Sequence, residues 1–84
     1  LLLRGAILAR GNVLLKLNVP ADRLEAVTAM LPAMSSPTVT TLARGAMNAV
    51  ETVVPKSGVN TLIPALKAAG AIDILEIPIS KIVE

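Results

Sequence analysis

The sequence of 84 residues contains no cysteine, no histidine and no aromatic residue. Without cysteine there is no disulfide framework, no thiolate nucleophile and no cysteine-ligated zinc site. Without histidine the usual side-chain base and nitrogen ligand for metals are missing. A sheet without aromatic rings cannot stack nucleobases as RNA-recognition domains do. These absences exclude many enzyme and RNA-binding classes, and they fit a reducing, cytoplasmic setting.

Charged residues are few and evenly spread. Eight basic and six acidic residues give a net charge of +2, and the basic residues form no patch for a nucleic acid or an anionic membrane. The longest charge-free stretch, residues 26–43, contains Pro32 and Pro37 and is unsuited to a bilayer helix. We therefore expect neither a nucleic-acid partner nor a membrane partner. The first residue is not methionine, which suggests a piece of a longer chain.

The spacing of apolar residues predicts the secondary structure. Apolar side chains alternate with polar ones over residues 13–19, which is typical of a half-buried strand, and Pro20 then opens a helix expected at about residues 20–31. A hairpin follows, with strands at 38–42 and 46–54 and a turn at Arg44-Gly45. A second helix is expected to begin after an N-cap at Ser57 and to end at Gly70 in a left-handed conformation. The last strand covers residues 72–77.

An internal repeat supports this order of elements. Five apolar or proline positions recur at an offset of 35 residues, from Val19, Pro20, Leu24, Val27 and Leu31 to Val54, Pro55, Val59, Leu62 and Leu66. A Val-Pro pair before an apolar stripe is also common at ordinary strand-to-helix junctions, but the shared offset favours a duplication. Two such halves predict an α+β, ferredoxin-like split βαβ fold (βαββαβ), with two helices on one face of a four-stranded antiparallel sheet.

The other face of that sheet is predicted to be open and unusually apolar. In the third strand Val50, Thr52 and Val54 would face the helices, while the opposite side carries Met47, Ala49 and Val53 beside Glu51. The chain is 54% hydrophobic, yet a domain this small buries only about 60% of its unfolded surface. We therefore expect another subunit or domain to cover the open face.

Polar residues at strand ends are the best candidates for a binding site. Asp22 and Glu25 indicate only a solvated helix start, and no glycine-rich phosphate loop is present. Asn18 ends the first strand, a serine-rich turn precedes Thr38, and Asp73 lies at the start of the last strand. Taken singly, Asn18 could instead cap the first helix, the serines could form turns and Thr38 could simply favour a strand.

An ordered series of motifs adds a family resemblance. The main motifs are Leu17-Asn18-Val19-Pro20-Ala21-Asp22-Arg23-Leu24, Leu31-Pro32, Ser36-Pro37-Thr38, Val53-Val54-Pro55, Leu62-Ile63-Pro64 and Leu66-Lys67-Ala68-Ala69-Gly70-Ala71. In this order and spacing the sequence resembles the C-terminal regulatory domain of long-form ATP phosphoribosyltransferase. The resemblance implies that residues 1–11 end a helix linking an upstream catalytic part to a regulatory domain at residues 12–84.

The resemblance also implies a function. That family joins ATP to phosphoribosyl pyrophosphate with magnesium, in the first step of histidine biosynthesis, and L-histidine inhibits it by feedback. The regulatory domains gather about a threefold axis in a hexamer and bind histidine between neighbours. The residues that match the ligand site are Asn18, Met34, Ser36, Thr38 and, through its backbone, Asp73. The resemblance implies no catalytic residue, metal ligand or cofactor in this segment.

Two departures from the family pattern leave alternatives open. Where the family has an acidic residue, glycine, tryptophan and valine, this sequence reads Arg44-Gly45-Ala46-Met47-Asn48, and Ala33-Met34 replaces a connection containing glycine. Met47 and Asn48 therefore support the alternative of a structural trimerisation module that binds no ligand. A nucleic-acid-binding domain of the same fold is a third option, which would require salt-dependent binding.

Overall fold

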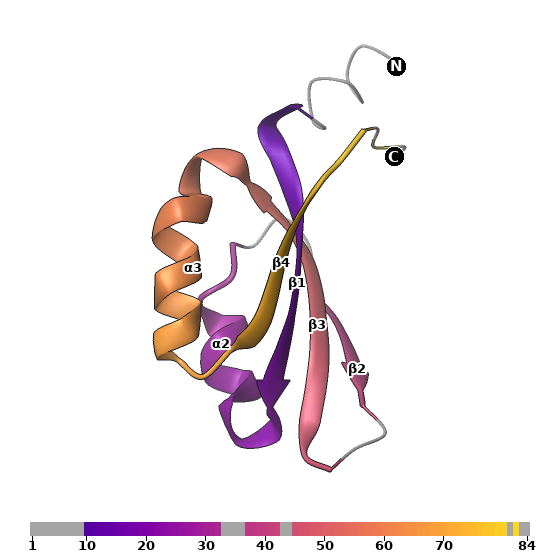
Figure 1. Cartoon of the computed structure of the whole chain (residues 1–84), viewed down its shortest axis with the longest axis vertical. Helices are drawn as coiled ribbons and strands as arrows, with labels where there is room; N and C mark the ends of the chain where they lie inside the picture. Colours follow the sequence, from indigo (N-terminus) through magenta and orange to yellow (C-terminus); the bar gives the residue numbers. More distant parts are fainter. Residues whose placement is uncertain (1–9, 33–36, 43–44, 81, 83–84) are drawn as a thin grey trace.

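The computed structural model of the chain describes residues 10–32, 37–42, 45–80 and 82. It contains a four-stranded antiparallel sheet with two α-helices on one face. The strand order is β2-β3-β1-β4. Figure 1 shows α2 and α3 on the same side of the sheet. The elements are β1 (Asn12–Pro20), η1 (Ala21–Arg23), α2 (Leu24–Ala29), β2 (Thr38–Thr41), β3 (Met47–Pro55), η2 (Lys56–Gly58), α3 (Val59–Ala68) and β4 (Ile72–Pro78). The predicted α+β, ferredoxin-like split βαβ fold is confirmed.

The two central strands build the core through their alternating side chains. β1 pairs with β3 along its whole length, from Asn12 opposite Pro55 to Pro20 opposite Met47. Alternate side chains of both strands point at the helices, where the fully buried aliphatic residues gather. These residues include Leu15, Leu17 and Val19 of β1, Val50 and Val54 of β3, Val27 of α2 and Leu66 of α3. The side-chain alternation predicted for β1 and β3 is confirmed.

Each repeat half turns from strand to helix at its proline. β1 and β3 end at Pro20 and Pro55, whose φ values of −57° and −62° lie where the proline ring fixes them. A single 3-10 turn, η1 or η2, follows each proline and leads into α2 or α3. The N-cap of α3 is Gly58, so the predicted cap at Ser57, which lies within η2, is wrong.

The first helix is shorter than the predicted range of residues 20–31. α2 proper covers Leu24–Ala29, and its end is tightened by hydrogen bonds from Met30 N to Val27 O and from Leu31 N to Thr28 O. Pro32 explains this end, because the residue before a proline avoids helical backbone angles and proline itself has no N–H to donate. The second helix ends as predicted, with Gly70 at a φ of +110°.

The hairpin accommodates the departure from the family pattern. Gly45 has a φ of +60°, as a tight turn requires, and Arg44 lies outside the described residues. Asn48 is buried on the core side of β3, and its Oδ1 accepts a hydrogen bond from the Thr41 hydroxyl at 3.4 Å. A polar residue therefore has a partner at this core-facing position. Residues 1–9 also lie outside the described residues, so the boundary between residues 1–11 and the domain at 12–84 stays a prediction.

Candidate functional site

Asn18 and Asp73 meet where β1 ends and β4 begins. They are 55 residues apart in the sequence, and Asn18 Nδ2 donates a hydrogen bond to Asp73 Oδ2 at 3.1 Å. Asn18 is half-buried and Asp73 is exposed, so the pair remains open to a ligand. Asn18 does not cap the following helical turn, because the N-cap of η1 is Pro20 and no side chain caps it. The two strand ends therefore converge as the sequence suggested.

A bulge in β4 brings Asp73 to this place. Lys16 lies opposite Leu75, but Asn18 lies opposite Ile72, so β4 has one residue more than β1 over this interval. Within the interval Asp73 adopts a φ of +52°. Bulges bend a strand and turn a side chain toward a new direction. Here the bulge turns the Asp73 carboxylate to the Asn18 amide, a contact that the family resemblance did not imply.

Thr38 lies on the same face of the sheet but apart from this pair. It is the first residue of β2 and lies opposite Glu51 of β3. Because β3 separates β2 from β1, Thr38 is two strands away from Asn18, or about 10 Å across the sheet at the usual strand spacing. It is also two residues out of register along the strands, since Thr40 is the residue level with Asn18. Met34 and Ser36 lie outside the described residues. The described chain therefore brings Asn18 and Asp73 together and leaves Thr38 at a distance.

An ion pair occupies the face between these positions. Lys16 Nζ lies 3.4 Å from Glu51 Oε1, and the two residues are opposite each other in the β1–β3 ladder. Neither residue stands out as functional in the sequence alone. The available signal was their opposite charges on the predicted open sides of two strands, but only the register shows that they meet. A ligand or partner on this face would encounter one cation and one anion that already neutralise each other.

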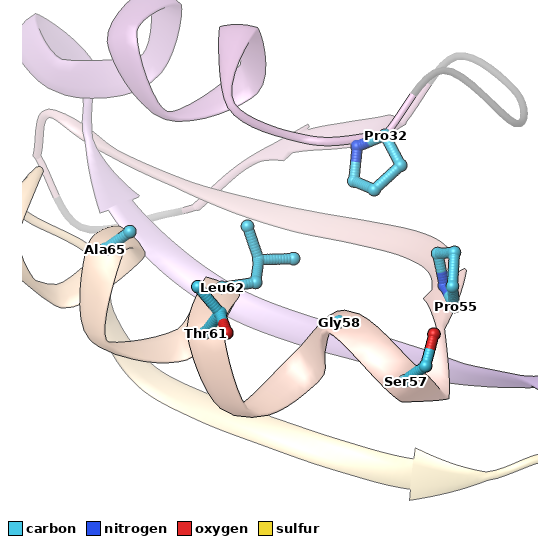
Figure 2. Close-up of a pocket in the computed structure, with 7 residues that line it drawn as sticks. All are labelled: Pro32, Pro55, Ser57, Gly58, Thr61, Leu62 and Ala65. Carbon is cyan, nitrogen blue, oxygen red and sulfur yellow. The ribbon is translucent and has the colours of Figure 1, made fainter.

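Described residues line two surface grooves on the helix side, away from this face. One of about 470 Å³ lies between α3, η2, the end of β3 and Pro32 (Figure 2). Its lining residues are Pro32, Pro55, Ser57, Gly58, Thr61, Leu62 and Ala65. The other, of about 690 Å³, lies between α2 and β2 and includes Glu25 and Val39. Neither groove is lined by Asn18, Thr38 or Asp73, and the first has no charged group to bind an ionic ligand.

The described residues offer no obvious metal centre. No three acidic side chains gather within reach of one ion in this part of the chain. Among the helices of the described ranges, none has the length and apolar character needed to cross a bilayer. The chemistry of the site is therefore that of an amide, a carboxylate and, across β3, a hydroxyl.

Comparison with known proteins places the chain in a family. The family model described as "HisG, C-terminal domain" matches residues 9–81. The ATP phosphoribosyltransferase of Pelotomaculum thermopropionicum is 50% identical over 82 residues, which are 98% of this chain and 28% of that protein. The enzyme of the same name from Chlorobium phaeovibrioides is 49% identical over 84 residues, which are 100% of this chain and 29% of that protein. The ATP phosphoribosyltransferase of Pyrobaculum aerophilum is 47% identical over 81 residues, 96% of this chain and 29% of its own length.

The chain thus spans less than a third of the length of the curated relatives that it matches. The family match over residues 9–81 covers every described residue except residue 82. The chain belongs to the HisG C-terminal domain family.

Proposed function

We propose that this chain is the regulatory domain of an ATP phosphoribosyltransferase, the first enzyme of histidine biosynthesis, and that it binds L-histidine as a feedback inhibitor. The family membership and the names of the relatives support the parent activity. The remaining length of those relatives leaves room for an upstream catalytic part, which would supply the reaction with ATP and phosphoribosyl pyrophosphate.

The observation that carries the proposal is the meeting of Asn18 and Asp73 at 3.1 Å. A zwitterionic amino acid has an ammonium group that needs acceptors and a carboxylate that needs donors. The Asn18 amide oxygen, on the other side of the amide from Asp73, is an acceptor for an ammonium or an imidazole N–H. The Thr38 hydroxyl and strand-end backbone N–H groups can serve the ligand carboxylate.

The proposed site lies between neighbouring copies of the chain. With β3 between them, Thr38 and the Asn18–Asp73 pair cannot both make short hydrogen bonds to one end of a small ligand. A second copy placed against the open face could complete the contacts around the ligand. Exposed apolar side chains on β4, Leu75 at 56% and Ile72 at 49%, favour such an arrangement. We propose a trimer of these domains within a hexameric parent.

The proposed regulation follows from linkage. Histidine can shift the enzyme between subunit arrangements only by binding one arrangement more tightly than another. A site shared by two copies satisfies this condition, because the contacts from the second copy exist only when the copies are suitably placed. The magnesium of the parent reaction would belong to the upstream part, since the described residues gather no cluster of three acidic side chains.

A titration with L-histidine tests the proposal on samples whose assembly is measured by light scattering. We expect saturable binding that falls about tenfold in Thr38→Val, which keeps the shape of the side chain and removes a hydroxyl hydrogen bond to a charged group. The matched control is Thr40→Val, which lies on the same strand and the same face, opposite Ala49. L-Histidinol, which lacks the carboxylate, should bind more weakly than L-histidine.

An assembled sample that takes up no histidine would reject the sensor and favour the alternative, a structural trimerisation module. Equal losses in Thr38→Val and Thr40→Val would show that the strand as a whole matters and that the Thr38 hydroxyl has no specific contact. Met47 and Asn48 are the sequence features that favour the module. The hydrogen bond of Asn48 in the hairpin accounts for a polar residue at a core-facing position and does not bear on ligand binding.

A further inference from the structure

We propose that Asp73 is a positioning residue, whose carboxylate fixes the rotation of the Asn18 amide so that Asn18 presents its oxygen to the ligand. The inference rests on the proposed function, since it concerns the same site. It goes further because it gives the side chain of Asp73 a role distinct from any contact made by its backbone. The observation that supports it is the hydrogen bond from Asn18 Nδ2 to Asp73 Oδ2 at 3.1 Å.

The chemistry of the two groups decides the orientation. An ionised carboxylate only accepts hydrogen bonds, whereas a primary amide has an NH₂ donor on one side and a carbonyl acceptor on the other. The two ends of an amide have nearly the same shape, so an amide is oriented by its partners. Facing Asp73, Asn18 must turn its NH₂ group to the carboxylate. Its Oδ1 then points away from Asp73 as an acceptor.

An acceptor at this position suits the ligand proposed above. The ammonium and the imidazole N–H of histidine are donors, and an NH₂ group turned toward them would repel them. Without a fixed partner, Asn18 would sample both orientations, and binding would have to select the productive one. Asp73 thus prepares the site before the ligand arrives, which reduces the ordering needed on binding.

The backbone at residue 73 narrows the choice of side chain. The φ of +52° falls in the left-handed region, which among residues other than glycine is entered most readily by Asn and Asp. Glycine would meet the backbone requirement but could not accept a hydrogen bond from Asn18. Asn would meet the backbone requirement and could accept through its own oxygen. These three residues therefore separate the role of the backbone from that of the carboxylate.

The neighbouring cation does not compete for the pair. Lys16 precedes Asn18 on the same face of β1, but its ammonium lies 3.4 Å from Glu51 on β3. β3 and β4 flank β1 on opposite sides, so Lys16 is engaged on the side away from Asp73. Asn18 and Asp73 can therefore act on each other without this charge between them.

The test compares Asp73→Gly and Asp73→Asn in the 84-residue chain, at matched assembly measured by light scattering. We expect Asp73→Gly to weaken L-histidine binding about fivefold to tenfold, because the Asn18 amide loses the partner that orients it and one hydrogen bond contributes on this order. Asp73→Asn should recover only part of the affinity, because its amide can accept from the Asn18 NH₂ but can also donate to the Asn18 oxygen. Glu76→Gln is the matched control, because it removes a negative charge from the same strand at a position opposite Leu15. It should leave the affinity unchanged.

A double-mutant cycle with Asn18→Ala distinguishes positioning from direct contact. If Asp73 acts through Asn18, Asp73→Gly should change affinity by less than about twofold in the Asn18→Ala chain. The same fivefold to tenfold loss in that background would overturn the proposal, because Asp73 would then touch the ligand itself. No loss in the chain that retains Asn18 would also overturn it.

A measurement without ligand separates this inference from the proposed function. The side-chain amide of Asn18 gives its own pair of proton signals in nuclear magnetic resonance, identified by their loss in Asn18→Ala. We expect Asp73→Gly to shift these signals and to speed their exchange with water, while Glu76→Gln leaves them in place. If histidine fails to bind, the proposed function is wrong, and these signals still decide whether Asp73 holds the amide. Unchanged signals in Asp73→Gly would overturn the positioning role.

Discussion

Two residues near the junction of α3 and β4 have a positive φ, and they have different local roles. Gly70, at +110°, ends α3, and the next amide, Ala71 N, donates to Leu66 O at 3.0 Å. This reversal lets the chain leave the helix and enter β4. Asp73, at +52°, lies in the β4 bulge and reaches Asn18. The first position serves the fold, and the second serves the candidate site.

Replacing Gly70 with alanine should destabilise the chain by about 1–2 kcal/mol. A residue with a Cβ is strained in the left-handed region by about this free energy. The new Cβ would also lie 3.0 Å from Cγ of Arg23. Urea unfolding monitored by circular dichroism measures the change. Gly58→Ala is the matched control, because Gly58 has a φ of −97° and a Cβ there would meet no atom within 4 Å. Equal stability of the two variants would contradict the prediction.

The same two residues show what a single sequence can and cannot predict. Gly70 follows an amphipathic stripe and a lysine, so its role as a helix end could be inferred from local chemistry. Nothing beside Asp73 marks a bulge, because the bulge exists only in the register between β1 and β4. The candidate residues Asn18 and Asp73 were therefore predictable as strand-end polar groups, but their hydrogen bond was not.

At the scale of elements, the order of strands and helices was predictable, because apolar side chains recur at a different spacing in a strand and in a helix. β1 and β3 alternate with period two, and α3 has its apolar stripe with period near 3.6. The residues at which the helices begin and end were less predictable. Ser57 is a good N-cap by type, yet the 3-10 turn η2 places Gly58 at the cap. Likewise, Pro32 stops α2 before the end of its apolar stripe, since backbone chemistry outweighs hydrophobic periodicity there.

Hydrogen exchange should rank the strands by their place in the sheet. β1 lies between two partners and contributes buried residues throughout, so its amides should be the most protected. β2 has four residues, all exposed, and pairs on one side only, so its amides should exchange fastest of the four strands. Mass spectrometry or nuclear magnetic resonance measures the rates. Equal protection of the β2 and β1 amides in the ligand-free chain would contradict this ranking and would mean that another copy or segment shields β2 from solvent.

At the scale of the whole molecule, the apolar surplus lies on the uncovered sheet face. Both helices are on the other side, and the elements described leave this face to solvent. Leu75 is 56% exposed there, close to the half-exposed ion pair of Lys16 and Glu51. An ion pair at such exposure contributes less than about 1 kcal/mol to folding. Because the ion pair lies on the open face, we expect it to align two associating copies more than to stabilise the fold of one copy.

Leu75→Glu should therefore weaken self-association without unfolding the chain. Leu75 lies directly opposite Lys16, so the new carboxylate gains a cross-strand cation within each chain. In an assembly through the open face, the same carboxylate would replace an apolar contact that contributes about 1.5–3 kcal/mol when fully buried. Light scattering across a dilution series should show the variant dissociating at concentrations at least about tenfold higher than the unsubstituted chain.

Met30→Glu provides the matched control for that experiment. Met30 is a large apolar residue, 37% exposed, that follows α2 on the helix side, so its replacement adds the same charge away from the open face. We expect it to leave the assembly unchanged. If Met30→Glu dissociates the assembly and Leu75→Glu does not, the chains associate through the helix side. The histidine site would then have to be complete within one copy, and Thr38 would lose its proposed role, because β3 keeps it two strands from Asn18.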